Sequence, residues 1–218
     1  MKDKIEKTAI GLLGRPLNAE DGLSTDEIEA VEIKLKYKLP IGLKYFYNAV
    51  GNLELFMSSF EDFPEPYLLD NKIIFLEENQ GVCYWGIDTK DMEKEDPFVY
   101  VCTDPEAEEP EWYPEEVTLA KFLEILLYYQ CAQGGYEYGG AVYETGFESR
   151  AAYEKFIEKV VVGWEKTVDH NGLVIYQQEE KLIWHFTDEE GKPQDILFGS
   201  ARTEKGINEL KLSGFTEL

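Results

Sequence analysis

The residues with the widest chemical repertoire are scarce in this chain, which has two histidines and three cysteines among 218 residues. His170 and His185 lack the HExxH spacing that sets two imidazoles on one helix face around zinc, and no cysteine lies near them in the sequence. A metal pair would therefore have to be assembled by folding. We interpret both histidines as structural or surface residues and expect no metal site.

The cysteines Cys83, Cys102 and Cys131 are equally unpromising as nucleophiles. A catalytic thiol needs a neighbouring base that lowers its pKa. Cys83 and Cys102 instead fall within strand-like runs of a net-negative region, which raises the pKa of a thiol. We therefore expect buried, structural cysteines. Their odd number and wide spacing also favour a reducing compartment over a disulfide framework.

One glycine-rich segment, 134–140, could imitate a phosphate-binding loop. No Gly-Lys-Ser/Thr sequence follows it, its surroundings are acidic, and the chain has no Walker A, GxSxG or strand-following GxGxxG motif. We interpret it as a flexible hinge in which Tyr136 and Tyr138 pack against the core. Carboxylate pairs are unavoidable with 44 acidic residues, so they do not by themselves indicate a hydrolase. We expect no catalytic residue and no cofactor.

The charge of the chain is more informative, because 44 acidic residues oppose 21 basic ones and give a net charge of -23. Such a protein repels phosphate backbones and anionic membranes, which argues against nucleic-acid binding and membrane association. Its expected partner is a basic protein. The excess is local, since residues 61–120 hold 18 acidic and 3 basic side chains. The middle of the chain is therefore where we look for a binding surface.

The excess peaks in the stretch from Asp104 to Glu116, called the acidic segment below, where three prolines exclude a regular helix or a central strand. We predict a solvated loop. Charge runs of this kind often do no more than keep a protein soluble. This one also carries aromatic residues of the types enriched among interface anchors. The candidate partner-binding residues are Asp104, Glu106, Glu108, Glu109, Glu111, Trp112 and Tyr113.

Helices and strands are segregated along the first part of the chain. Ser24 and Glu27 have the spacing of a capping box, and the apolar stripe that follows predicts a helix that ends at Pro40. A second helix is expected over 40–50, and Gly81 suits a hairpin turn. The remaining predictions here are strands over 72–76, 82–87 and 98–102 and a deeply buried helix over 119–129.

The part after the glycine-rich segment repeats this order, with one helix along 153–164 followed by short strands and a last helix over 204–212. The strands are expected near 173–177, 182–187 and 195–198. The fold class is therefore α+β, with a central antiparallel sheet flanked by helices and a C-terminal helix-plus-strands extension. We divide the chain into a domain over 1–133, a hinge over 134–140 and an extension over 141–218, which could continue the same sheet.

The chain carries no evident targeting signal. Its first fourteen residues are charged and lack the apolar stretch of a signal peptide. No run approaches the ~20 apolar residues that a membrane-spanning helix needs. Together with the cysteine usage, this predicts a cytoplasmic protein.

Several short motifs follow one another in a characteristic order between Glu20 and Ala132. They are Leu39-Pro40, Tyr45-Phe46 with Asn48, Asn79-Gln-Gly81, Trp85-Gly86-Ile87, Asp96-Pro97 leading into Val99, and Phe122-Leu123. In this order and spacing, this part of the chain resembles the SUKH superfamily, which includes bacterial toxin-immunity proteins and a fungal cell-wall-assembly regulator. The chain departs from the usual Asn-Gly after the second helix, where it has Gly51-Asn52.

The resemblance implies a binding protein. Many members of the superfamily look like immunity proteins that bind and block a toxin domain, often a nuclease or deaminase, inside the producing cell. They share no catalytic constellation, so no catalytic residue is carried over. We therefore expect a non-enzymatic intracellular immunity protein that blocks a basic toxin domain. A regulatory scaffold of the same fold that binds a host protein, and a carboxylate-dependent hydrolase, stay open as alternatives.

Overall fold

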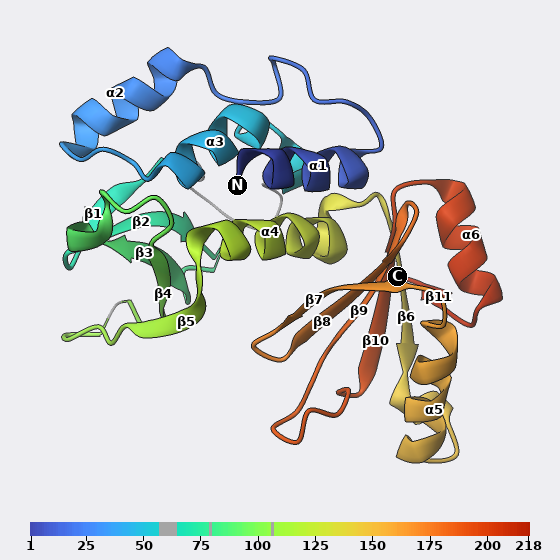
Figure 1. Ribbon diagram of the computed structural model, residues 1–218. Helices are drawn as coiled ribbons and strands as arrows, with labels where there is room; N and C mark the ends of the chain where they lie inside the picture. The colour runs from blue at the N-terminus through green and yellow to red at the C-terminus, as the bar shows by residue number, and fades with distance from the viewer. Residues whose placement is uncertain (57–64, 79, 106) are drawn as a thin grey trace. The chain divides into compact units, whose positions relative to one another are not determined.

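The computed structural model confirms the α+β class, with six α-helices and two antiparallel sheets of five and six strands among the residues it describes. Those residues are 1–56, 65–78, 80–105 and 107–218. The chain divides into two compact units, Met1–Leu127 and Tyr128–Leu218 (Figure 1). Within the described ranges, no helix is long and apolar enough to cross a membrane.

Helices open the first unit: α1 (Lys2–Leu13), α2 (Thr25–Leu35) and α3 (Ile41–Val50). The predicted capping box is present at the start of α2. The amide of Glu27 donates to Ser24 Oγ over 3.3 Å, and the amide of Ser24 donates to Glu27 Oε2 over 2.8 Å. The helix ends at Leu35, before Pro40, because Lys36 adopts a left-handed conformation with a φ of 61°.

The corner between α2 and α3 is built around the carboxylate of Glu32, which is 5% exposed. It accepts hydrogen bonds from the amide of Leu39 over 2.9 Å, from Lys38 Nζ over 2.6 Å and from Lys44 Nζ over 3.2 Å. Burial alone would raise the pKa of Glu32, but these donors outweigh it and hold the pKa below its ordinary value. A charged side chain thus fixes the entry into α3.

The first sheet is an antiparallel meander in the order β1-β2-β3-β4-β5. The hairpin between β2 and β3 turns at Gly81, which has the positive φ expected of it, 72°. Helix α4 packs on this sheet, with the Phe122 ring 5.8 Å from Phe75 and 6.1 Å from Trp85. The elements are β1 (Tyr67–Leu69), β2 (Lys72–Glu77), β3 (Tyr84–Asp88), β4 (Phe98–Cys102), β5 (Tyr113–Thr118) and α4 (Leu119–Gln130).

The acidic segment is not a loop throughout, because β5 begins within it at Tyr113. A strand can form over Pro114 because β5 lies at the edge of the sheet, where a missing N–H breaks no ladder on the outer side. The pairing with β4 is irregular here, with a register shift between Phe98 and Tyr100. The loop proper therefore ends at Trp112.

The second unit has its own sheet, in the order β11-β6-β10-β9-β8-β7, so residues 141–218 do not continue the first sheet. Helices α5 and α6 cover one face of it, burying a core that includes Tyr153, Ile157, Ile183 and Leu210. The elements are β6 (Tyr138–Tyr143), α5 (Arg150–Val160), β7 (Glu165–His170), β8 (Leu173–Gln178), β9 (Lys181–Phe186), β10 (Ile196–Ala201), α6 (Glu204–Leu212) and β11 (Thr216–Glu217).

Short helical turns connect these elements. Those with i→i+3 geometry are Glu54–Phe56, Thr89–Asp91 and Glu144–Gly146, and a π-helical turn, Cys131–Gly135, follows α4.

The glycine-rich segment 134–140, predicted as a hinge, is divided between that π-helical turn and strand β6. Its last glycine is needed for close packing. Gly140 pairs with Gly199 on β10, and a Cβ on Gly140 would lie 3.1 Å from the carbonyl oxygen of Thr216. A Cβ on Gly199 would lie 2.9 Å from the ring of Phe215. The two glycines let the chain after α6 lie directly against the sheet.

Candidate functional site

Most of the predicted partner-binding carboxylates lie together on the connection from β4 to β5, where they are exposed. These are Asp104, Glu108, Glu109 and Glu111, whereas Glu106 lies outside the described residues. None of the four forms an ion pair within the described part of the chain. The connection therefore presents uncompensated negative charge to solvent beside a sheet edge.

Trp112 is half-buried and contacts other parts of the sheet, in contrast to these carboxylates. Its Nε1–H donates to Asp70 Oδ2 over 3.2 Å, and Lys72 Nζ lies 5.5 Å from the centre of its ring. The same ammonium group lies 5.0 Å from the centre of the Tyr100 ring and 3.6 Å from Asp88 Oδ2. Lys72 is thus enclosed by two aromatic rings and a carboxylate, a favourable cation–π arrangement. Trp112 fastens the end of the acidic connection to the sheet.

Tyr113 is the aromatic side chain of the segment that stays available, with 50% of its surface exposed. Its hydroxyl donates to Glu111 Oε2, and this hydrogen bond to a carboxylate raises the pKa of Tyr113. The phenol therefore stays protonated at neutral pH. Phe98, half exposed on the neighbouring strand, is a further aromatic residue that the sequence did not single out. Phe98 pairs with Thr118 of β5. Successive side chains of a strand point to opposite faces, so the buried Val99 next to it is the signal that Phe98 is exposed.

Glu115 shows that the segment also contains a structural acid. Its side chain is buried and accepts a 2.6 Å hydrogen bond from Trp85 Nε1. Trp85 in turn packs against Phe122 of α4. Glu115 therefore connects the edge strand to the sheet core, and no sequence pattern distinguishes it from its exposed neighbours.

The cysteines are free thiols, and Cys102 and Cys131 are buried as expected, while Cys83 is half-buried. Burial raises the pKa of Cys83, and the nearby carboxylate of Glu78 raises it further. Burial also raises the pKa of Cys131. These thiols are protonated at neutral pH, which is the opposite of what a nucleophilic cysteine requires.

The two histidines lie on different strands, His170 at the end of β7 and His185 within β9, with β8 between them. No group of three or more His, Cys, Asp and Glu side chains in the described ranges has an arrangement that could hold a metal ion. His185 is nevertheless distinctive, since it is 3% exposed and lines a cavity of about 440 Å³ inside the second unit. We call this the His185 cavity.

The walls of the His185 cavity come from one helix, three strands and a loop. Helix α5 contributes Glu154, Ile157 and Glu158, and Val161 follows its end. The strands contribute Lys166 and Asp169 from β7, Val174 and Tyr176 from β8, and His185 from β9. The connection after β9 contributes Thr187, Gly191, Lys192 and Pro193. Residues this far apart in the sequence carry no common spacing, so a sequence motif could not have revealed the site.

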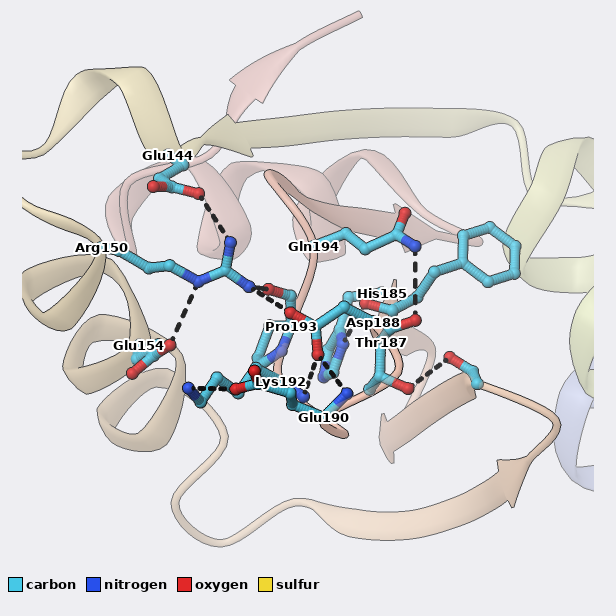
Figure 2. Close-up of polar contacts among 12 residues, drawn as sticks. Glu144, Arg150, Glu154, His185, Thr187, Asp188, Glu190, Lys192, Pro193 and Gln194 are labelled. Atoms are coloured by element: carbon cyan, nitrogen blue, oxygen red, sulfur yellow. Dashed lines mark hydrogen bonds and ion pairs between the residues drawn. The ribbon is translucent and has the colours of Figure 1, made fainter.

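The loop that closes one side of the cavity is clamped by Arg150, at the start of α5 (Figure 2). Its guanidinium donates to the carbonyl oxygen of Pro193 over 2.7 Å and to Asp188 Oδ2 over 2.9 Å. Glu144 and Glu154 flank the same guanidinium at 3.7 and 3.3 Å. Asp188 also accepts the amide of Lys192 over 2.9 Å. One cation thus joins α5 to both ends of the loop.

A second cavity in this unit, of about 310 Å³, is largely apolar. The rings of Trp184 and Phe198, stacked with centres 4.2 Å apart, form part of its wall. Tyr136 and Tyr138 line it as well, and Tyr136 is buried, in line with the packing role expected of it. No charged side chain lines this cavity within the described part of the second unit.

Comparison of the chain with protein-family models, with curated proteins and with solved structures found no significant match in any of the three.

Proposed function

We propose that the chain is a non-enzymatic, cytoplasmic binding protein of the SUKH type that neutralises a positively charged toxin domain. The observation that carries this proposal is the set of four exposed carboxylates without ion pairs, Asp104, Glu108, Glu109 and Glu111, beside the edge strand β5. The order of SUKH-like motifs between Glu20 and Ala132 supports the proposal that the protein is of the SUKH type. A toxin that acts on nucleic acid has a basic cleft, because its substrate is a polyanion.

The mechanism is electrostatic and steric. Opposite fields steer the two proteins together, with association rates that can approach ~10⁸–10⁹ M⁻¹s⁻¹ at low salt. The carboxylates then occupy the cleft and exclude substrate. The anchoring role belongs to Tyr113, because the indole of Trp112 is already engaged by Asp70 and Lys72. Trp112 instead holds the connection in place before the partner arrives, which lowers the entropy lost on binding.

The decisive experiment is co-expression with a toxin domain encoded next to this chain's own gene, where the immunity role predicts one, scored by cell survival and by isolation of a complex. Survival together with a stable complex supports immunity. A complex with a host protein, and no protection from the toxin, points to the regulatory scaffold instead.

A pair of charge-reversed variants tests the surface itself. The first carries lysine at Asp104, Glu108, Glu109 and Glu111; the control carries lysine at the exposed Glu29, Glu54, Glu93 and Glu95 of the same unit. Both variants have the same net charge, so they differ only in where the charge lies. The first should slow association roughly tenfold or more at low ionic strength, with the difference shrinking as salt screens it. Equal association rates for the two variants would show that the connection from β4 to β5 takes no part in binding.

A further inference from the structure

The His185 cavity has a buried floor with a free hydrogen-bond acceptor. His185 Nδ1 lies 3.1 Å from the carbonyl oxygen of Phe186, the next residue of β9. A carbonyl oxygen only accepts, so Nδ1 carries the proton and Nε2 carries the lone pair. Burial lowers the pKa of His185, and the charge of Lys166 lowers it further, so this neutral tautomer is the one present at pH 7.

Nε2 is the ring nitrogen of His185 that remains accessible. Nε2 has no hydrogen-bond partner among the described residues. Unlike Tyr153 Oη, which also lacks a partner, Nε2 is not fully shielded from the surface. The remaining accessible surface of His185 therefore includes Nε2, and the side chain lines the cavity. An accessible acceptor of this kind can take a hydrogen bond from an N–H or O–H donor that enters the cavity.

The charged groups around the cavity leave an excess of negative charge. The carboxylates of Glu154, Glu158 and Asp169 face the ammonium groups of Lys166 and Lys192. Both ammonium groups are committed, Lys166 to Asp169 at 2.9 Å and Lys192 to Glu190 at 2.8 Å.

The two carboxylates of α5 differ in whether a cation is paired with them. Glu154 is held by Arg150, whereas Glu158 forms no ion pair within the described ranges. Glu158 is therefore the carboxylate of this cavity that is left without a paired cation among the described residues.

We propose that the His185 cavity binds an organic cation, a primary ammonium or guanidinium group. One N–H of the cation donates to His185 Nε2, and its charge faces Glu158. The ring of Tyr176, 6.3 Å from the His185 ring, adds an aromatic face of the kind that attracts cations. A volume of about 440 Å³ accommodates a small amine or one long basic side chain. The proposal is independent of the toxin-binding role, because it involves no residue of the acidic segment.

The cation can come from a free amine or from an arginine side chain of another polypeptide. Agmatine, a small molecule with a guanidinium at one end and an ammonium at the other, represents the free amine. Nα-acetyl-arginine amide represents the side chain in a polypeptide. γ-Guanidinobutyrate, in which a carboxylate replaces the ammonium of agmatine, is the matched control ligand, and it should bind more weakly because the cavity rim is acidic.

The two histidines make the binding directly observable by NMR. His185 reports on the cavity, and His170, which does not line it, is the internal control. Agmatine or acetyl-arginine amide should shift the imidazole resonances of His185 in a saturable manner, with half-saturation below about 10 mM, and leave those of His170 unchanged. Saturation by agmatine alone assigns the site to a free amine. Saturation by acetyl-arginine amide assigns it to a basic side chain.

Two variants on exposed positions complete the test. Glu158→Gln should weaken binding about tenfold, because it removes the unpaired carboxylate. Glu148→Gln, an equal charge change outside the cavity, should leave binding unchanged. The proposal is overturned if no cation saturates the His185 signal, if His170 responds equally, or if Glu158→Gln binds as tightly as the unaltered chain.

Discussion

The ammonium group of Lys72 lies 5.5 Å from the centre of the Trp112 ring, so a lysine of β2 holds the tryptophan that ends the acidic connection. The contact spans the sheet from its second strand to the entry of its edge strand. Trp112 is therefore held against the sheet and is not available as an anchor for a partner.

Trp112→Ala should release the acidic connection from the sheet. The change removes the hydrogen bond to Asp70 and the contact with Lys72, and it should lower the free energy of unfolding by about 1 kcal/mol. Cleavage by a glutamate-specific protease at Glu108 and Glu111 should become faster, whereas the bond after Glu109 precedes Pro110 and is resistant. Trp112→Phe retains a ring over Lys72, so its cleavage rate should lie between those of the unaltered chain and the alanine variant. Cleavage at an unchanged rate in the alanine variant would show that Trp112 does not hold the connection.

Glu32→Gln should destabilise the first unit by about 2 kcal/mol at neutral pH, because two lysines and a buried amide lose their charged acceptor. The folded-state pKa of Glu32 is lowered, so its stabilisation is complete above the ordinary glutamate pKa and is lost as the pH falls through the folded value. The difference between the two proteins should therefore shrink in acid. Denaturant unfolding across pH measures this, with Glu29→Gln on the exposed face as control. A difference that grows in acid would contradict the assignment.

Gly199→Ala should destabilise the second unit by about 1–3 kcal/mol, because the new methyl group would meet the Phe215 ring at 2.9 Å. Gly139→Ala is the matched control, since its methyl group would have no neighbour closer than Leu218 at 4.0 Å. That change should be neutral or slightly stabilising, because alanine restricts the unfolded chain. Thermal unfolding of the two variants distinguishes two explanations for these glycines. Close packing tolerates only Gly139→Ala, whereas a flexible hinge would tolerate both changes.

Arg150→Gln should loosen the loop that closes the His185 cavity. Asp188 and the carbonyl oxygen of Pro193 lose their shared donor, and amide exchange at Gly191 and Lys192 should accelerate roughly tenfold. Lys155→Gln removes one positive charge from an exposed position of the same helix and should leave the exchange rates unchanged. Equal exchange in both variants would show that the loop is held by its own turn.

Local patterns predicted the elements whose ends are fixed by neighbouring residues. The capping box of Ser24 and Glu27 and the turn at Gly81 are decided within a few residues, and both are present. The strand β6 was not predicted because Gly139 and Gly140 resemble a chain break, whereas close packing against Thr216 and Phe215 requires glycine at position 140. Strand β7 was missed because it lies at a sheet edge, and only Val168 in it is buried.

The candidate site divides in the same way. The exposure of Asp104, Glu108 and Glu109 follows from composition and prolines alone. The contact of Trp112 with Lys72 joins residues forty positions apart in the chain, and no local pattern could reveal it. His185 likewise gains its cavity from elements that fold against it from elsewhere in the sequence.

The edge strand β5 bears on how copies of this protein behave in a crowded solution. An open strand edge is a template for another chain, and long uncovered edges lead to aggregation. Pro114 offers no N–H to an incoming strand, and the carboxylates on the approach to β5 repel a second copy with the same charges. The carboxylates that we propose bind a basic partner thus also oppose self-association.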